Sequence, residues 1–291
     1  MAQHVFLNGD FVERDSARLD IYDHGFLYGD GVFEGIRVYD GRVFRLDEHV
    51  VRLYNSARSL AIDVGMQLEQ MREAILETCR RNGHQTGYIR VSVSRGIGLG
   101  LDPAHIDARA TVVISTEQLS LYPPKMYEEG LTVITASTRV PPSCCIDPQI
   151  KSLGRYVNNI NAKMEANRCG AGEALMLNMA GNVAEASGDN LFLVRSGELV
   201  TPPTSEGALP GITRSAVMAC AEDLGIPVRQ AVVTLYDCYN ADEAFLTGTA
   251  AEVIPMVRLD GRTIAGGKPG SITQRLTEAF RRRTRIDGTA I

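Results

Sequence analysis

The chain has 291 residues, more than a single hydrophobic core usually organises, so we expect one large domain or two of medium size. Its 44% hydrophobic and 22% charged residues are typical of an ordinary globular protein. The formal net charge of −5 argues against nucleic acid as the main partner, because neutralising phosphates requires a basic surface.

The N-terminus, MAQHVFLNGDFV, lacks the basic residues and long apolar stretch of a secretion signal, and no window has the length of a membrane span. The six cysteines are scattered, with no C-x-x-C pair and no regular spacing to the five histidines. The sequence therefore predicts a cytoplasmic protein with reduced thiols, no metal site and no membrane partner.

The first elements predicted along the chain are strands. An Asn8-Gly9 pair between two apolar runs is typical of a tight hairpin turn with positive φ. A glycine-rich loop then becomes an alternating strand, in which Phe33, Gly35 and Arg37 share one face.

Two helices and two more strands are predicted next. Asp47 is a plausible N-cap for a helix that runs to about Leu60, and a second helical period covers residues 68–81. The strand at residues 88–94 places Tyr88 and Arg90 on the same face, and residues 110–115 have the pattern of a buried strand.

The division into domains is predicted from a proline-bearing segment. Residues 118–130 are the best candidate for a linker, which gives a small N-terminal domain at 1–117 and a larger C-terminal domain at 131–291. In the second domain, a helix should begin after Leu209-Pro210-Gly211 and end before Gly225, and a terminal helix should cover residues 272–283. Strands are expected at residues 131–136, 173–178, 183–186 and 191–195.

One lysine lies in an unusual setting. The chain has four lysines, and Lys151 is the one flanked by apolar residues and followed shortly by a glycine. An amine, unlike a guanidinium, can lose its proton and attack a carbonyl, so Lys151 is a candidate nucleophile. The plainer interpretation is a surface lysine whose stem covers apolar neighbours.

A lysine that forms a Schiff base is most useful beside a carbonyl cofactor such as pyridoxal phosphate, which requires an anion site and an acidic partner. The helix start at Gly211, Ile212 and Thr213 offers backbone N–H groups and a hydroxyl, and Thr249 and Arg52 are further candidates for binding a phosphate. Glu185 could keep a pyridine nitrogen protonated, or it could be a solvated glutamate at a strand end.

The order of these residues resembles that of the class IV aminotransferases, the fold-type IV pyridoxal-phosphate enzymes, and most of all the branched-chain amino acid aminotransferases. The resemblance spans nearly the whole chain. It is carried by seven blocks: residues 28–37, residues 49–53, residues 88–90, Lys151 with Tyr156, residues 185–192, residues 209–214 and residues 248–252.

The resemblance implies an α+β fold of two domains, a small N-terminal α/β domain and a larger β-rich domain, with the cofactor in the cleft. It implies that Lys151 bonds to pyridoxal 5'-phosphate and then moves the proton of the substrate α-carbon. The other implied cofactor-binding residues are Arg52, Gly211, Ile212, Thr213 and Thr249 at the phosphate, Glu185 at the ring nitrogen, Tyr156 at the phenolic oxygen and Leu209 at the ring face.

The implied reaction is transamination of L-leucine, L-isoleucine or L-valine with 2-oxoglutarate. The same fold also leaves open a D-amino acid or (R)-amine transaminase, or aminodeoxychorismate lyase. The resemblance implies a homo-oligomer, a dimer or higher, in which Tyr28 reaches the partner's site. The implied substrate-binding residues are Tyr28, Phe33, Gly35, Arg37, Tyr88, Arg90 and Ala250.

Overall fold

The computed structural model describes residues 3–106, 109–118 and 122–291. The chain divides into two compact units: the first comprises Met1–Leu119, Ile150–Arg155 and Thr284–Ile291, and the second comprises Ser120–Gln149 and Tyr156–Arg283. The segment that holds Lys151 therefore belongs to the first unit. The domain boundaries predicted from the sequence stay a prediction; within the predicted linker, residues Pro124–Glu129 form helix α4.

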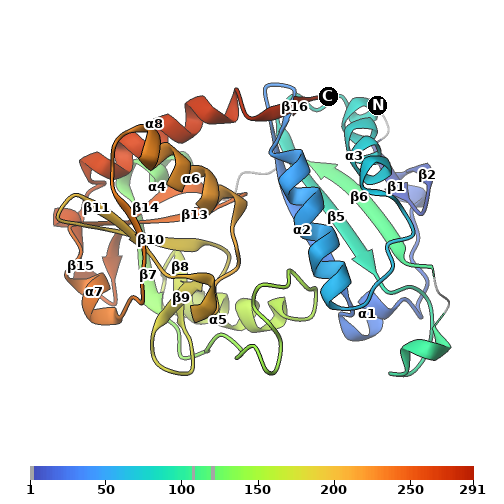
Figure 1. The fold of residues 1–291 in the computed structure, drawn as a ribbon, viewed down its shortest axis with the longest axis horizontal. Helices are drawn as coiled ribbons and strands as arrows, with labels where there is room; N and C mark the ends of the chain where they lie inside the picture. The colour runs from blue at the N-terminus through green and yellow to red at the C-terminus, as the bar shows by residue number, and fades with distance from the viewer. Residues whose placement is uncertain (1–2, 107–108, 119–121) are drawn as a thin grey trace. The chain divides into compact units, whose positions relative to one another are not determined.

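A seven-stranded sheet organises the first unit, with strand order β16-β4-β3-β5-β6-β1-β2 (Figure 1). Its helices are α1 (His24–Tyr28), α2 (Leu46–Ser59) and α3 (Leu68–Asn82), with short 3-10 helices at Arg14–Ser16 and Pro103–His105. The strands are β1 (His4–Leu7), β2 (Asp10–Glu13), β3 (Gly31–Tyr39), β4 (Arg42–Phe44), β5 (Gly87–Ser94), β6 (Thr111–Glu117) and β16 (Gly288–Ala290).

Helices α2 and α3 pack on the sheet and close the core of the first unit (Figure 1). Side chains from the sheet and both helices, among them Ile36, Leu53 and Ile75, have 1% exposure or less. The predicted hairpin is confirmed: β1 pairs with β2 through Asn8 and Gly9, whose φ angles of 53° and 106° are those of a tight turn.

The predicted start of α2 was wrong by about two residues. Asp47 does not cap the helix; the N-cap is Arg45, whose left-handed φ of 48° lets the helix begin at Leu46. Asp47 lies in the first turn, where a carboxylate suits the helix dipole, and its Oδ1 accepts a hydrogen bond from Arg72 Nε at 2.7 Å.

A nine-stranded sheet organises the second unit, in the order β12-β11-β10-β13-β14-β7-β8-β9, with β15 paired to β14 (Figure 1). The strands are β7 (Leu131–Thr135), β8 (Glu173–Leu177), β9 (Val183–Ala186), β10 (Asn190–Arg195), β11 (Glu198–Thr201), β12 (Val228–Gln230), β13 (Glu243–Gly248), β14 (Glu252–Leu259) and β15 (Arg262–Thr263). The helices are α4, α5 (Tyr156–Arg168), α6 (Ile212–Asp223), α7 (Leu235–Tyr239) and α8 (Ser271–Thr284, whose last residue belongs to the first unit), with 3-10 helices at Thr204–Glu206 and Ala265–Gly267.

The four strands and two helices predicted for this part of the chain are confirmed to within about two residues at their ends. Helix α6 begins after Gly211 and is followed by Gly225 with a φ of 67°, as the sequence predicts. The core is formed by fully buried side chains of several strands, including Leu175, Leu191 and Ile254. Across residues 3–106, 109–118 and 122–291, no helix has the length and apolar character needed to cross a membrane.

Candidate active site

The backbone of Lys151 is held against strand β3 although the two lie far apart in sequence. Phe33 N donates to Lys151 O at 3.0 Å, and Leu153 N donates to Gly31 O at 2.8 Å. Ser56 of α2 accepts a further hydrogen bond on its Oγ from Lys151 N at 3.2 Å. The strand and the helix therefore fix where the lysine side chain begins.

Strands β3 and β5 present the predicted substrate-binding residues in register. Phe33, Gly35 and Arg37 lie opposite Ser92, Arg90 and Tyr88, respectively. The Arg90 guanidinium carbon lies 3.5 Å from the centroid of the Phe33 ring, and Lys151 Nζ lies 4.7 Å from the same centroid. The structure thus brings Phe33, Arg90 and Lys151 together within the first unit.

Gly35 leaves room for the close approach of Tyr88. A Cβ atom at position 35 would lie 1.9 Å from the Tyr88 hydroxyl oxygen, far inside any allowed contact. Arg90 Nε donates to Ser92 Oγ at 3.1 Å, and the Arg37 guanidinium lies over the Tyr39 ring, 5.2 Å from its centroid. These contacts give the β3–β5 face a fixed arrangement of aromatic rings and cations.

Tyr28 is the last residue of α1. Its side chain is 43% exposed, and its hydroxyl accepts a hydrogen bond from Gly100 N at 3.3 Å. The Tyr28 hydroxyl therefore bonds to the loop that follows β5.

A buried charge network surrounds Arg52, and the sequence interpretation missed two of its members. Arg52 donates from Nε to Glu34 Oε1 at 2.7 Å and from Nη2 to Glu34 Oε2 at 2.8 Å, and His49 Nδ1 lies 2.7 Å from the same Oε2. The local signals were available: Glu34 alternates with Phe33 and Gly35 along β3, and the spacing of His49 and Arg52 puts both on one face of a helix.

The protonation states of this network follow from its geometry. Burial raises the pKa of Glu34, but the charges and hydrogen bonds of Arg52 and His49 outweigh that effect and lower it to about 2. Burial lowers the pKa of His49 despite the opposing effect of Glu34, and the positive charges of Arg52 and Lys151 lower it further. Near neutral pH, Glu34 is therefore a carboxylate and His49 a neutral donor.

In the second unit, Glu185 is bonded to the segment that leads into α6. Its Oε2 accepts hydrogen bonds from Leu209 N at 2.8 Å and from Asn190 Nδ2 at 3.4 Å, and Asn190 Nδ2 also donates to Leu209 O at 3.0 Å. A Cβ atom at Gly211 would lie 2.0 Å from Asn190 Oδ1, so only glycine fits there. Glu185, Leu209 and Gly211 are thus brought together just before the helix.

The first turn of α6 contains Ile212 and Thr213, both buried, with no acidic residue. The N-cap, Gly211, has no side chain that could bond to the N–H groups of this turn. Thr249 and Ala250 lie in the turn between β13 and β14, directly after Gly248. A Cβ atom at Gly248 would meet Asp189 Oδ1 at 1.9 Å. Tyr156 is the first residue of α5.

Each of the two units carries groups that a phosphorylated carbonyl cofactor with a pyridine ring requires. Within the second unit, these groups are the backbone N–H groups at a helix start, threonine hydroxyls and the buried carboxylate of Glu185. Within the first unit, they are the amine of Lys151 and the guanidinium of Arg52. The fit is supported by the glycine at position 211, where a side chain would displace Asn190 from its bonds to Glu185 and Leu209.

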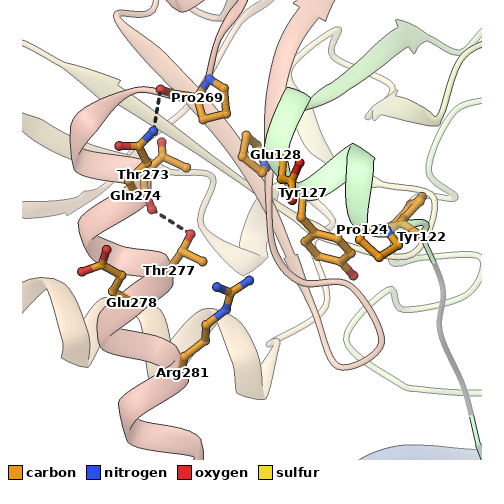
Figure 2. Close-up of a pocket in the computed structure, with 11 residues that line it drawn as sticks. Tyr122, Pro124, Tyr127, Glu128, Pro269, Thr273, Gln274, Thr277, Glu278 and Arg281 are labelled. Carbon is orange, nitrogen blue, oxygen red and sulfur yellow. Dashed lines mark hydrogen bonds between the residues drawn. The ribbon is translucent and has the colours of Figure 1, made fainter.

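Two pockets lie elsewhere, and the predicted site residues line neither. One has a volume of about 580 Å³ and lies against α4 and α8 in the second unit, where Tyr127, Glu278 and Arg281 are among its lining residues (Figure 2). The other, of about 650 Å³, lies beside β1 and β6 in the first unit. In the part of the chain that the structure describes, no cluster of three or more His, Cys, Asp and Glu side chains could hold a metal ion.

Comparison with known proteins identifies the family. Residues 31–259 match the model of the class IV aminotransferases. The branched-chain-amino-acid aminotransferase of Escherichia coli K12 is 34% identical over 96% of this chain and 92% of its own length, and a Methanocaldococcus jannaschii protein provisionally given the same name is 46% identical over 95% of both chains.

Solved structures agree with the sequence matches. The crystal structure of the Escherichia coli enzyme superposes with a TM-score of 0.94 at 34% identity, covering 97% of this chain and 94% of that one. The branched-chain amino acid aminotransferase of Thermobaculum terrenum, in its holo-form with PLP, gives 0.89 at 29% identity, covering 98% and 95%. The predicted α+β fold of fold-type IV is therefore confirmed, and the chain belongs to the class IV aminotransferases.

Proposed function

We propose that this protein is a pyridoxal-phosphate-dependent aminotransferase that exchanges the amino group of L-leucine, L-isoleucine or L-valine with 2-oxoglutarate. The observation that carries the proposal is the position of Lys151. Its backbone carbonyl accepts a hydrogen bond from Phe33 N, and its Nζ lies near the Phe33 ring that Arg90 also contacts. Relatives with 34–46% identity over nearly the whole chain support the same activity.

The cofactor, when bound, supplies an electron sink for the charge that develops at the substrate α-carbon. Lys151 would carry the proton between that carbon and the cofactor, because its amine is the basic group anchored at the β3 strand. Glu185 would hold a proton on the pyridine nitrogen, and Tyr156 would donate to the phenolic oxygen. The phosphate would be bound by Arg52, Thr249, Ile212 and Thr213, with Leu209 against the ring and Gly211 leaving room at the helix start.

Substrate selection is assigned to the β3–β5 face. Phe33 would contact an apolar side chain, and the Arg90 guanidinium over its ring would meet the distal carboxylate of 2-oxoglutarate. Tyr88 and the backbone at Ala250 would bind the α-carboxylate, while Gly35 and Arg37 shape the wall beside them. One surface can then serve both an apolar substrate and an acidic one.

We also propose a homo-oligomer, to which Tyr28 contributes from α1. Several large apolar side chains are exposed on α1, on the segment before it and on the loop that follows β5. A backbone hydrogen bond from Gly98 N to Tyr22 O at 3.0 Å joins that loop to the segment before α1. Exposed apolar surface of this extent is typical of an interface. The residues are Leu19, Ile21, Tyr22, Phe26, Tyr28, Ile97, Leu99 and Leu101.

A cytoplasmic location forms part of the same proposal. All six cysteines are free thiols, which suits a reducing compartment.

A substrate panel tests the proposed activity. Steady-state rates are measured with L-leucine, D-alanine and (R)-1-phenylethylamine as amino donors and 2-oxoglutarate as acceptor. We expect L-leucine to be preferred by orders of magnitude in kcat/KM. A preference for D-alanine or for the amine would contradict the proposal, as would turnover of aminodeoxychorismate without any 2-oxo acid.

A further inference from the structure

Arg52, assigned above to the cofactor phosphate, is itself held by a carboxylate that the interior almost completely encloses. Glu34 is 1% exposed, and the Arg52 side chain 11%. Both Glu34 oxygens are engaged: Oε1 accepts from Arg52 Nε at 2.7 Å, and Oε2 accepts from Arg52 Nη2 at 2.8 Å and from His49 at 2.7 Å. A carboxylate with three such donors has very little freedom to move.

The sequence places this carboxylate away from the substrate-binding face. Alternation along β3 turns Glu34 to the side opposite Phe33 and Gly35, which is the side that α2 covers. His49 and Arg52 are three residues apart on α2 and therefore share one face of that helix. The surrounding side chains, such as Val32, Ile36 and Leu53, are apolar and buried.

A two-point contact with a carboxylate fixes a guanidinium more strictly than a single hydrogen bond does. The group is planar and carries five N–H bonds in a rigid fork, and Glu34 accepts from Nε and from Nη2. These two bonds fix the plane of the guanidinium and therefore the direction in which its Nη1 atom points. For a ligand with several anionic oxygens, an arginine held in this way is already oriented before binding, so less conformational entropy is lost on binding.

We propose that Glu34, supported by His49, is a positioning residue that orients Arg52 toward the phosphate of the cofactor. This inference rests on the proposed function, which assigns the phosphate to Arg52. Glu34 itself contacts neither substrate nor cofactor in this account. It acts through the arginine, so its effect should appear in the affinity for the phosphate group and not in the affinity for the pyridine ring.

The test compares two ligands that differ only in the phosphate. The dissociation constants of the apoenzyme for pyridoxal 5'-phosphate and for pyridoxal are measured by absorbance titration. The constant for pyridoxal divided by the constant for pyridoxal 5'-phosphate is the ratio that reports what the phosphate contributes. Residues that orient metal-binding side chains typically change metal affinity by about 10–100-fold when removed, and we take the same range for the partner of a phosphate-binding arginine. We expect Glu34→Gln to reduce the ratio by a factor in that range while pyridoxal binds almost as in the wild type.

A purely structural role for Glu34 predicts a different result. Loss of packing between β3 and α2 would weaken both ligands alike and leave the ratio unchanged, and that outcome would overturn the proposal. If Glu34→Gln does not fold, Glu34→Asp serves the same purpose, because it keeps the charge but shortens the reach to Arg52. An unchanged ratio in Glu34→Asp would also count against positioning.

A matched control is available in the same unit. Asp30 accepts from Arg95 Nε at 2.6 Å and from Arg95 Nη2 at 3.1 Å, which is the same two-point pairing without a predicted phosphate contact. We expect Asp30→Asn to leave the ratio at its wild-type value. A reduction as large as that of Glu34→Gln would show that any broken arginine–carboxylate pair has the effect, and would refute the inference.

Arg52→Lys separates this inference from the function on which it rests. It should reduce the ratio by itself, and Glu34→Gln added to it should cause no further loss, because lysine cannot form the two-point contact. If Arg52→Lys keeps the wild-type ratio, the assignment of the phosphate to Arg52 fails. If it reduces the ratio but Glu34→Gln alone does not, only the positioning role fails.

Discussion

Replacing Gly35 by alanine would place a methyl group 1.9 Å from the hydroxyl oxygen of Tyr88. An ordinary contact begins at 3.4 Å, so the hydroxyl must move by about 1.5 Å, the difference between these two distances. Tyr88 can rotate because the atom that clashes is at the end of its side chain. A misplacement of about 1 Å at a substrate-positioning group can cost about 10²-fold in rate, so we expect kcat/KM for L-leucine to fall about 100-fold.

Three measurements distinguish this effect from general damage. Steady-state kinetics with L-leucine gives kcat/KM, an absorbance titration gives the affinity for pyridoxal 5'-phosphate, and thermal unfolding gives Tm; the last two should stay near their wild-type values. In a Tyr88→Ala background, adding Gly35→Ala should change kcat/KM little, because the clashing side chain is gone. Wild-type kcat/KM in Gly35→Ala would refute the assignment of Tyr88 to substrate binding.

Three further predictions follow from the same structure. Phe26→Asp adds a charge to the exposed apolar surface around α1, so light scattering should detect a smaller species than the wild type; an unchanged mass would argue against an interface there. Arg90→Leu should lower kcat/KM for 2-oxoglutarate by about 10²-fold or more, because the acidic substrate loses its charged partner. The half-reaction with L-leucine should keep most of its rate. Equal losses of rate with L-leucine and with 2-oxoglutarate would contradict this. Above pH 4.5, urea unfolding should give the wild type a higher free energy of unfolding than Glu34→Gln. This difference should fall by on the order of 3 kcal/mol as the pH drops toward 2, because the unfolded chain takes up the Glu34 proton at a higher pH than the folded chain. A constant difference across that range would disprove a lowered pKa of Glu34.

The parts of the site that follow from local patterns could be predicted. Strand alternation fixes which side chains share a face, so Phe33, Gly35 and Arg37 could be grouped without a structure. The helix start after Gly211 follows from backbone preferences of proline and glycine that act within a few residues. Family resemblance then joined these groups into one expected site.

The parts that depend on contacts between distant segments could not be predicted from local patterns. Nothing near Lys151 indicates that its backbone pairs with β3, because this pairing depends on the path of the chain through both units. Local patterns give the alternation of Glu34 along β3 and put His49 and Arg52 on one face of a helix, but they do not show that this strand and this helix pack with these residues against each other. The cap at Asp47 was mispredicted since Arg45 adopts a left-handed conformation that its residue type rarely favours.

We expect the amine of Lys151 to bond to the cofactor. Borohydride reduction of the protein with bound pyridoxal 5'-phosphate makes such a bond permanent, and peptide mass spectrometry then identifies the modified lysine. The chain offers four candidates, Lys125, Lys151, Lys163 and Lys268. We expect the modification at Lys151, with no stoichiometric labelling of the Lys151→Ala variant; labelling at another lysine, or none in the wild type, would contradict the account.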